Sequence, residues 1–196
     1  MSEKENKFFA MLSRMKYINR WGLMRNTIQE NIAEHSLETG MIAHALAVIN
    51  NVYFEGDLNP DRVAVYAMYH DVPEIITGDL PTPVKYFAPE IKESYDAVEA
   101  AAIRKLLYSL PEKMRDIYSE ILKENEIEDE YRILVKAADK LSALIKCVEE
   151  KKMGNQDFLE AEKATMIAIK KLGCKEADYF MEHFLEAYGL TLDEQA

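Results

Sequence analysis

Prolines and glycines divide most of this chain into helical stretches, and this punctuation constrains the fold more than any other feature. A proline is tolerated in the first turn of a helix, where its missing N–H would have had no partner. A glycine just past an apolar periodic stretch ends a helix by adopting a left-handed conformation. Prolines in the first role and glycines in the second are Pro60, Pro89, Pro111, Gly154, Gly173 and Gly189.

Apolar residues recur at three- and four-residue spacing between these positions, and no stretch shows the strict alternation of a half-buried strand. We therefore predict an all-α fold, a single-domain helical bundle over residues 1–196. A chain of 196 residues suits one domain, and 48% hydrophobic residues can supply its core. Helices are predicted at about 5–17, 31–51, 60–71, 89–109, 111–125, 128–154, 155–172 and 175–188.

The charge and hydropathy of the chain exclude several classes of partner. The net charge is −11 and no basic face is visible, so we expect no binding to nucleic acid. No apolar run reaches the roughly 20 residues that cross a bilayer, and the charged N-terminus lacks the apolar region of a signal peptide. We expect a cytoplasmic protein with no membrane partner. A small anion could bind where a metal or an arginine inverts the local field.

The stretch AMYHDVPEIITGDLPTPVKYF carries the densest set of chemical residues. It places His70 and Asp71 at the end of a predicted helix, which Pro73 should terminate. A His-Asp doublet alone is a weak signal, since a metal site needs several ligands brought together from different elements. His35 and Asp139 lie on two other predicted helices. Asp139 is flanked by small and apolar residues, where a carboxylate is costly to bury without a partner such as a cation.

The pattern of His35, the His70-Asp71 doublet and Asp139 on separate helices resembles the signature of HD-domain metal-dependent phosphohydrolases. Four longer stretches resemble the bacterial HD-domain 5′-deoxynucleotidases nearly end to end. This resemblance implies an all-helical homodimer that uses a divalent metal to hydrolyse deoxyribonucleoside 5′-monophosphates to deoxyribonucleosides and phosphate. The stretches are NRWGLMRN with ENIAEHSL, the histidine-containing stretch quoted above, VKAADKLSALIKCVEE and DYFMEHF.

The resemblance implies that His35, His70, Asp71 and Asp139 ligate the metal. Two imidazoles and two carboxylates favour one divalent transition-metal ion, which could be Co, Mn, Fe, Ni, Cu or Zn. A water molecule activated by such an ion can act as the nucleophile near neutral pH.

Further residues receive roles in the same way. Glu74, three residues after Asp71, is expected to act as the acid/base residue, and Asp79 to contact the substrate or the departing 5′ oxygen. Arg20 offers bidentate contact to a phosphate, and Trp21 would pack on the sugar and reject a ribose hydroxyl. The catalytic set is thus Glu74, Asp79 and Arg20. The substrate-binding set is Arg20, Trp21, Asp71, Asp79, Leu80, Pro81, Thr82 and Asp139.

Two alternatives stay open at this point. One is another HD-type phosphohydrolase that acts on a deoxynucleoside triphosphate or a phosphodiester; the small size and acidic surface argue against it. The other is a non-catalytic helical module that binds metal or dimerises. A structural metal site is normally closed, which would leave Glu74, Asp79 and Arg20 without a purpose. The sequence does not assign the base preference, the metal, the proton donor among the two acids, the dimer interface or the biological role.

Overall fold

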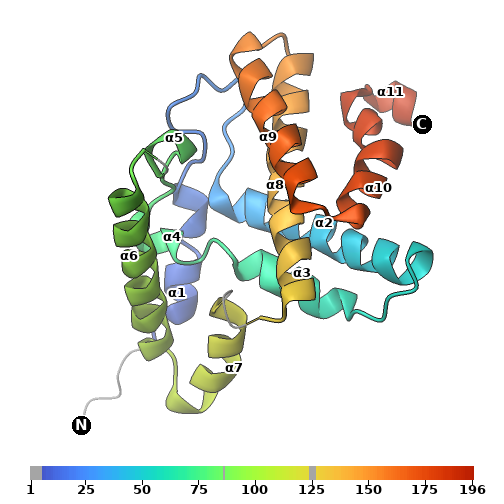
Figure 1. The fold of residues 1–196 in the computed structure, drawn as a ribbon. Coiled ribbons are helices and arrows are strands. Elements are labelled where there is room, and N and C mark those ends of the chain that lie inside the picture. Colours follow the sequence, from blue (N-terminus) through green and yellow to red (C-terminus); the bar gives the residue numbers. More distant parts are fainter. Residues whose placement is uncertain (1–5, 86, 124–126) are drawn as a thin grey trace. The chain divides into compact units, whose positions relative to one another are not determined.

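The computed structural model describes residues 6–85, 87–123 and 127–196, and within these ranges every regular element is helical (Figure 1). Within the same ranges, extended backbone pairs only at an isolated antiparallel bridge between Asn19 and Asn31. The all-α prediction is confirmed. The α-helices are α1 (Phe8–Leu12), α2 (Ile32–Tyr53), α3 (Pro60–Tyr69), α4 (Glu74–Thr77), α5 (Thr82–Lys85), α6 (Pro89–Tyr108), α7 (Glu112–Leu122), α8 (Asp129–Lys152), α9 (Leu159–Leu172), α10 (Lys175–His183) and α11 (Leu192–Gln195).

Most of the predicted punctuation is confirmed. Helix α3 begins at Pro60, α6 begins at Pro89, and α7 begins directly after Pro111. Gly173 ends α9 with a left-handed φ of 62°, and Gly154, with a φ of 83°, follows the end of α8. These glycines adopt conformations that side chains with a Cβ rarely reach.

Two predicted helices are shorter than expected. The prediction over 5–17 is wrong in extent, because α1 ends at Leu12 and only a 3₁₀ turn, Met15–Tyr17, follows. The Ser13 hydroxyl donates to the Ala10 carbonyl at 3.0 Å, a local bond that competes with continuation of the helix. The prediction over 175–188 is likewise divided into α10 and a 3₁₀ turn, Leu185–Gly189, and the predicted left-handed stop at Gly189 is wrong, because Gly189 belongs to that turn and has no positive φ.

Contacts between Cα atoms group the chain into two compact units. The first unit contains the described residues up to Leu23, then Gln29–Ser36 and Tyr69–Ile127. Its core brings α1, the start of α2 and the helices α6 and α7 around fully buried Phe8, Ile32 and Leu106. Val72, also buried in this core, anchors the turn that follows α3.

The second unit contains Met24–Ile28, Leu37–Met68 and Glu128–Ala196. Helix α8 is its centre and packs against α9, α10 and the 3₁₀ turns Gln156–Phe158 and Leu185–Gly189. The division does not test whether residues 1–196 form one domain, so that expectation stays a prediction.

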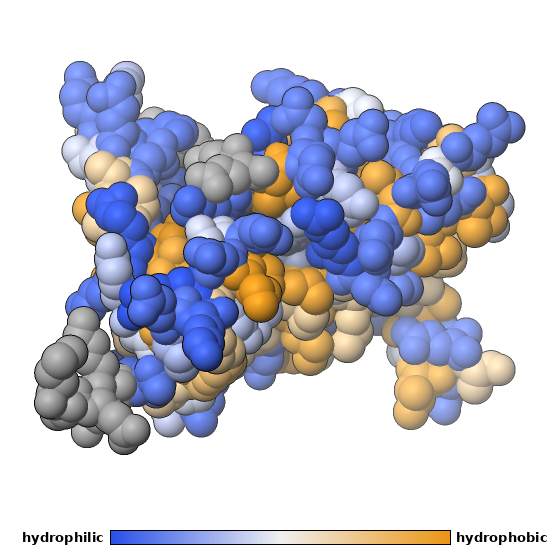
Figure 2. Space-filling view, turned by 90° about the horizontal axis from the view of Figure 1, so that it is seen from below, coloured by the Kyte–Doolittle hydropathy of each residue, from blue (hydrophilic) through white to orange (hydrophobic). Residues whose placement is uncertain are grey.

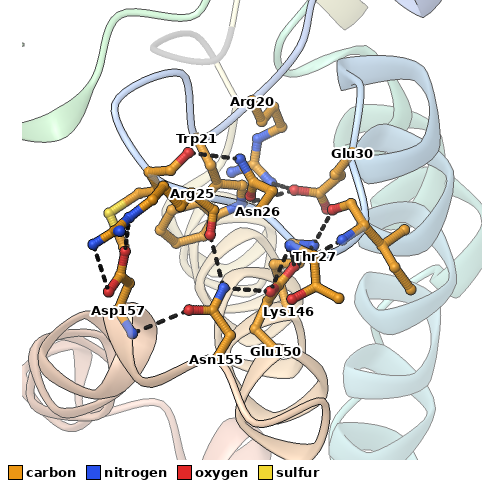
Figure 3. A network of polar contacts seen from close by, with 12 residues as sticks. Arg20, Trp21, Arg25, Asn26, Thr27, Glu30, Lys146, Glu150, Asn155 and Asp157 are labelled. Carbon is orange, nitrogen blue, oxygen red and sulfur yellow. Dashed lines mark hydrogen bonds and ion pairs between the residues drawn. The ribbon is translucent and has the colours of Figure 1, made fainter.

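The short Met24–Ile28 segment of the second unit is held by Glu150 of α8. The Glu150 carboxylate, 2% exposed, accepts hydrogen bonds from the backbone N–H groups of Thr27 and Ile28, from Asn155 Nδ2 at 2.7 Å and from Lys146 Nζ at 2.5 Å (Figure 3). Burial alone would raise the pKa of Glu150, but these donors outweigh it and lower the pKa below its usual range.

Hydrophobic side chains also reach the surface, where Figure 2 shows them scattered among hydrophilic residues on one face. In α2 the exposed hydrophobic residues include Leu37, Met41, Val52 and Tyr53. None of the described helices is both long and apolar enough to span a membrane.

Candidate active site

Three of the four predicted metal ligands converge in the first unit. Ligand atoms of His35, His70 and Asp71 all lie within 4.8 Å of one another. His35 Nε2 lies 3.5 Å from Asp71 Oδ2, and His70 Nε2 lies 3.2 Å from Asp71 Oδ1. Two imidazole nitrogens and a carboxylate at this spacing are a donor set that fits a divalent transition metal.

The local sequence explains how each of these ligands is placed. Asn31 caps α2 by accepting bonds from the N–H groups of Ala33 and Glu34, so fully buried His35 lies in the first turn of the helix. His70 and Asp71 lie in the turn between α3, which ends at Tyr69, and α4. Pro73 disfavours continuation of α3 through this turn.

The fourth predicted ligand, Asp139, lies on α8 in the second unit. Its side chain is half-buried, and its neighbours Ala137 and Ala138 are fully buried. Its participation in the metal site stays a prediction.

The two predicted acids lie in the same unit as the three ligands. Glu74 begins α4, and its buried Oε2 has no hydrogen-bond partner among the described residues. Burial raises the pKa of Glu74 to about 9, and the carboxylates of Asp71 and Asp79 add to this, against Arg20 and His70. Glu74 thus holds a proton at neutral pH when no metal offsets the negative charge.

Asp79 follows Gly78, whose φ of 73° turns the chain after α4. Burial raises the pKa of Asp79, while the Arg20 guanidinium and a hydrogen bond from the Trp21 backbone oppose the shift. Glu74 and Asp79 are therefore both influenced by the charges of Arg20 and Asp71, and perturbed carboxyl groups of this kind are common at functional sites.

Arg20 and Trp21 are joined by a residue that the sequence analysis missed. Glu30 Oε2 accepts hydrogen bonds from Arg20 NH1 at 3.0 Å and from Trp21 Nε1 at 2.9 Å (Figure 3). Trp21 has a φ of 60°, which for a bulky residue costs on the order of 1–3 kcal/mol. No pattern in the sequence distinguishes Glu30 from a solvated acid before a helix.

The three residues predicted to line the substrate pocket follow Asp79 directly, in a short turn and the start of α5. Leu80 and Pro81 are half-buried, and Thr82 is exposed as the first residue of α5. A second residue that the sequence analysis missed is Tyr95 of α6, which contacts the turn just before Asp79. Its hydroxyl lies 3.1 Å from Thr77 Oγ1 and 3.2 Å from the Gly78 carbonyl oxygen.

Solved structures place this fold in a class. A Listeria innocua HD-domain phosphohydrolase matches with a TM-score of 0.82 at 23% identity, covering 96% of this chain and 91% of that one. A cyanophage S-2L HD phosphohydrolase, bound to dA and one catalytic Zn²⁺ ion, matches with a TM-score of 0.64 at 20% identity, covering 95% and 98%. The fold is that of the HD-domain phosphohydrolases.

Sequence comparison narrows the class to one family. The family model described as 5′-deoxynucleotidase YfbR-like matches residues 7–188. The 5′-deoxynucleotidases YfbR of Shigella boydii and Escherichia coli are each 49% identical over 191 residues, 97% of this chain and 96% of theirs. The chain belongs to the 5′-deoxynucleotidase YfbR-like family.

Proposed function

We propose that this enzyme hydrolyses deoxyribonucleoside 5′-monophosphates to deoxyribonucleosides and inorganic phosphate. The observation that carries the proposal is the convergence of His35, His70 and Asp71 within 4.8 Å, in a chain of the YfbR-like family. The relatives named 5′-deoxynucleotidase support the substrate class.

His35, His70 and Asp71 would hold a divalent transition-metal ion, and Asp139 is proposed as the fourth ligand. Bound there, such an ion would act as a Lewis acid and lower the pKa of a water molecule toward neutrality. The donor set suits Co, Mn, Fe, Ni, Cu or Zn, and metal reconstitution should determine which of them supports turnover.

Glu74 and Asp79 are proposed to move protons during hydrolysis. The water gives up a proton to one of these carboxylates as its oxygen bonds to phosphorus, the bond between phosphorus and the 5′ oxygen breaks, and the departing 5′ oxygen takes up a proton. Glu74 suits this exchange because its pKa is raised in the metal-free site, and the positive charge of a bound ion would lower this pKa toward neutrality.

Arg20 and Trp21 are proposed to recognise the substrate. The guanidinium of Arg20 would neutralise the phosphate dianion, and the Trp21 ring would pack on the sugar where a 2′-hydroxyl would otherwise fit. Leu80, Pro81 and Thr82 are proposed to line the same pocket. The chain is further proposed to act as a homodimer in the cytoplasm, as its family resemblance implies.

A panel of phosphate-release assays tests the proposal. Deoxyribonucleoside 5′-monophosphates, ribonucleoside 5′-monophosphates, 3′-monophosphates and triphosphates are each incubated with Mn, Co or Mg and with a chelator. Release from deoxy 5′-monophosphates alone, abolished by chelation and restored by Co or Mn, is the expected result. Asp71→Asn should abolish it, whereas His44→Asn, a change at an exposed histidine outside the site, should not.

Two other outcomes would redirect the proposal. Release of pyrophosphate or tripolyphosphate from triphosphates would identify a different HD-type hydrolase. Tight metal binding without release from any substrate would identify a non-catalytic metal-binding module.

A further inference from the structure

A single carboxylate oxygen of Glu30 connects the two residues that are proposed to recognise phosphate and sugar. Arg20 NH1 and Trp21 Nε1 both donate to Glu30 Oε2, at 3.0 Å and 2.9 Å. The side chains of Arg20 and Glu30 are only 13% and 12% exposed, so solvent weakens this ion pair little. Neither donor can move without disturbing the acceptor of the other.

The backbone fixes Glu30 relative to the same two residues. The Arg20 N–H donates to the Glu30 carbonyl oxygen at 2.9 Å, and the Ile32 N–H donates to the Ile18 carbonyl oxygen at 3.0 Å. The bridge between Asn19 and Asn31 lies between these bonds. These backbone bonds place Glu30 opposite Arg20 independently of the side-chain contacts.

Trp21 occupies a conformation that needs such support. Its φ of 60° is disfavoured for a bulky side chain, and strained residues of this kind concentrate at ligand-binding sites. The indole N–H is held by Glu30, and the Trp21 backbone hydrogen-bonds to Asp79. Asp79 thus holds the Trp21 backbone, and Glu30 holds the indole ring.

We propose that Glu30 is a positioning residue that orients Trp21 and Arg20 together and so sets the discrimination between deoxyribose and ribose. This inference rests on the proposed function. A charged acceptor suits the role, because one carboxylate oxygen accepts two donors and also balances the guanidinium. Loss of Glu30 frees the indole to rotate away from the sugar position.

Glu30 is not among the described residues whose ligand atoms group within 4.8 Å, which are His35, His70 and Asp71. Glu30 Oε1 lies 4.0 Å from His35 Nδ1, whereas His35 Nε2 is the nitrogen that lies 3.5 Å from Asp71 Oδ2. Glu30→Ala should therefore retain metal at the wild-type stoichiometry, which separates a positioning effect from loss of the metal site.

The first test compares kcat/KM for a deoxyribonucleotide and its ribonucleotide in Glu30→Ala, with Glu120→Ala, a change at an exposed glutamate of α7, as control. The ratio is expected to fall at least tenfold in Glu30→Ala and to stay within twofold in the control. A purely structural role would lower both kcat/KM values by one factor and leave the ratio unchanged, which would overturn the proposal.

A double variant sharpens this test. If Glu30 acts through Trp21, the ratio in Glu30→Ala/Trp21→Ala should equal that in Trp21→Ala alone, since coupled residues are not additive. Multiplicative losses would contradict the proposal. If Glu30→Ala folds poorly, Glu30→Gln retains one neutral acceptor and should give a smaller loss of the ratio in the same direction.

A second readout does not depend on turnover, because Trp21 is the only tryptophan of the chain. Its emission in Glu30→Ala should shift to the red and be quenched more by acrylamide than in wild type and Glu120→Ala. Unchanged emission and quenching would overturn the proposal. If wild type releases no phosphate from any deoxynucleotide, the proposed function fails, and the fluorescence still decides whether Glu30 holds Trp21.

Discussion

Glu74 and Glu150 are both removed from water, and their pKa values move in opposite directions. Glu74 has an oxygen with no partner among the described residues and a pKa raised to about 9. Glu150 accepts bonds from Lys146, Asn155 and two backbone N–H groups, and its pKa is lowered. Burial favours the protonated form of both groups; the Asp71 and Asp79 carboxylates add to this effect at Glu74, whereas the donors of Glu150 outweigh it.

The oxygens of Glu150 are occupied by structural hydrogen bonds, whereas Glu74 keeps an oxygen that has no partner among the described residues. The donors of Glu150 stabilise it as a carboxylate. Because Thr27 is one of these donors and Lys146 also donates to the Ile28 carbonyl oxygen, the same network fixes the Met24–Ile28 segment (Figure 3). Glu74, by contrast, has a buried oxygen with no partner among the described residues, which suits its proposed role in proton transfer. Four experiments can break or sharpen this comparison.

The largest effect is expected on turnover when Glu74 is replaced. Glu74→Gln should lower kcat by about 10²–10⁴-fold, because general acid–base catalysis supplies this much. Bound metal should stay at the wild-type amount, since Glu74 is not among the three converging ligands. Steady-state assays with metal analysis check this, and Glu120→Gln is the exposed control. Turnover near wild type would remove Glu74 from proton transfer.

Glu150→Ala should act on stability instead. Removing one partner of a buried ion pair leaves Lys146, 6% exposed, without its carboxylate, and this typically costs about 3–5 kcal/mol of unfolding free energy. Denaturant unfolding measures the loss. Glu160→Ala, which breaks an exposed pair with Lys163, should cost less than about 1 kcal/mol. Equal costs in the two variants would mean that the buried network contributes no more than a surface pair.

In metal-free protein, the contributions of Glu74 and Glu150 to the free energy of unfolding should depend on pH in opposite directions. The folded pKa of Glu74 lies above its unfolded value of roughly 4.3, so its contribution to stability falls as pH rises from 5 to 8. The folded pKa of Glu150 lies below, so its contribution is lost as pH falls below about 4. One group changes the unfolding free energy by at most about 1.4 kcal/mol per pH unit.

Unfolding free energies measured with a chelator across pH 3–8 test both signs. Glu74→Gln should flatten the upper part of the profile, and Glu150→Gln should flatten the lower part. A variant that changes the wrong part, or neither, would contradict the assignment of that pKa shift.

The positions of His70 and Asp71 after a helix could be predicted in part, because their determinants are local. Pro73 disfavours helical backbone at Val72, so the helix was predicted to end at about His70 or Asp71; α3 in fact ends at Tyr69, and both residues lie in the turn that follows. Helix starts at Pro60 and Pro89 were predictable for the same reason, since each depends on one residue and its neighbours.

Glu30 and Tyr95 could not be predicted, because their roles depend on segments that meet only in the folded chain. Glu30 belongs to a loop with no periodicity, and only the fold shows that it lies opposite Arg20 and accepts hydrogen bonds from both Arg20 and Trp21. Tyr95 lies in a helix where an aromatic residue normally indicates packing, yet its hydroxyl reaches Gly78. The position of Asp139 relative to the other ligands likewise depends on tertiary structure.

The smallest effect is expected at Tyr95, whose hydroxyl contacts Thr77 and Gly78, the two residues before Asp79. Tyr95→Phe removes the hydroxyl that lies near Thr77 Oγ1 and the Gly78 carbonyl oxygen, and one such bond contributes about 0.5–1.5 kcal/mol. The turn before Asp79 should loosen, so KM for the deoxynucleotide should rise by about two- to threefold while kcat stays close to wild type. Replacement of a neighbouring aromatic that lacks this contact, Tyr108→Phe at the exposed end of α6, should leave KM unchanged. A fall in kcat of tenfold or more would instead show that the hydroxyl acts on the reacting groups, which would move Tyr95 from the supporting framework into the same class as Glu74.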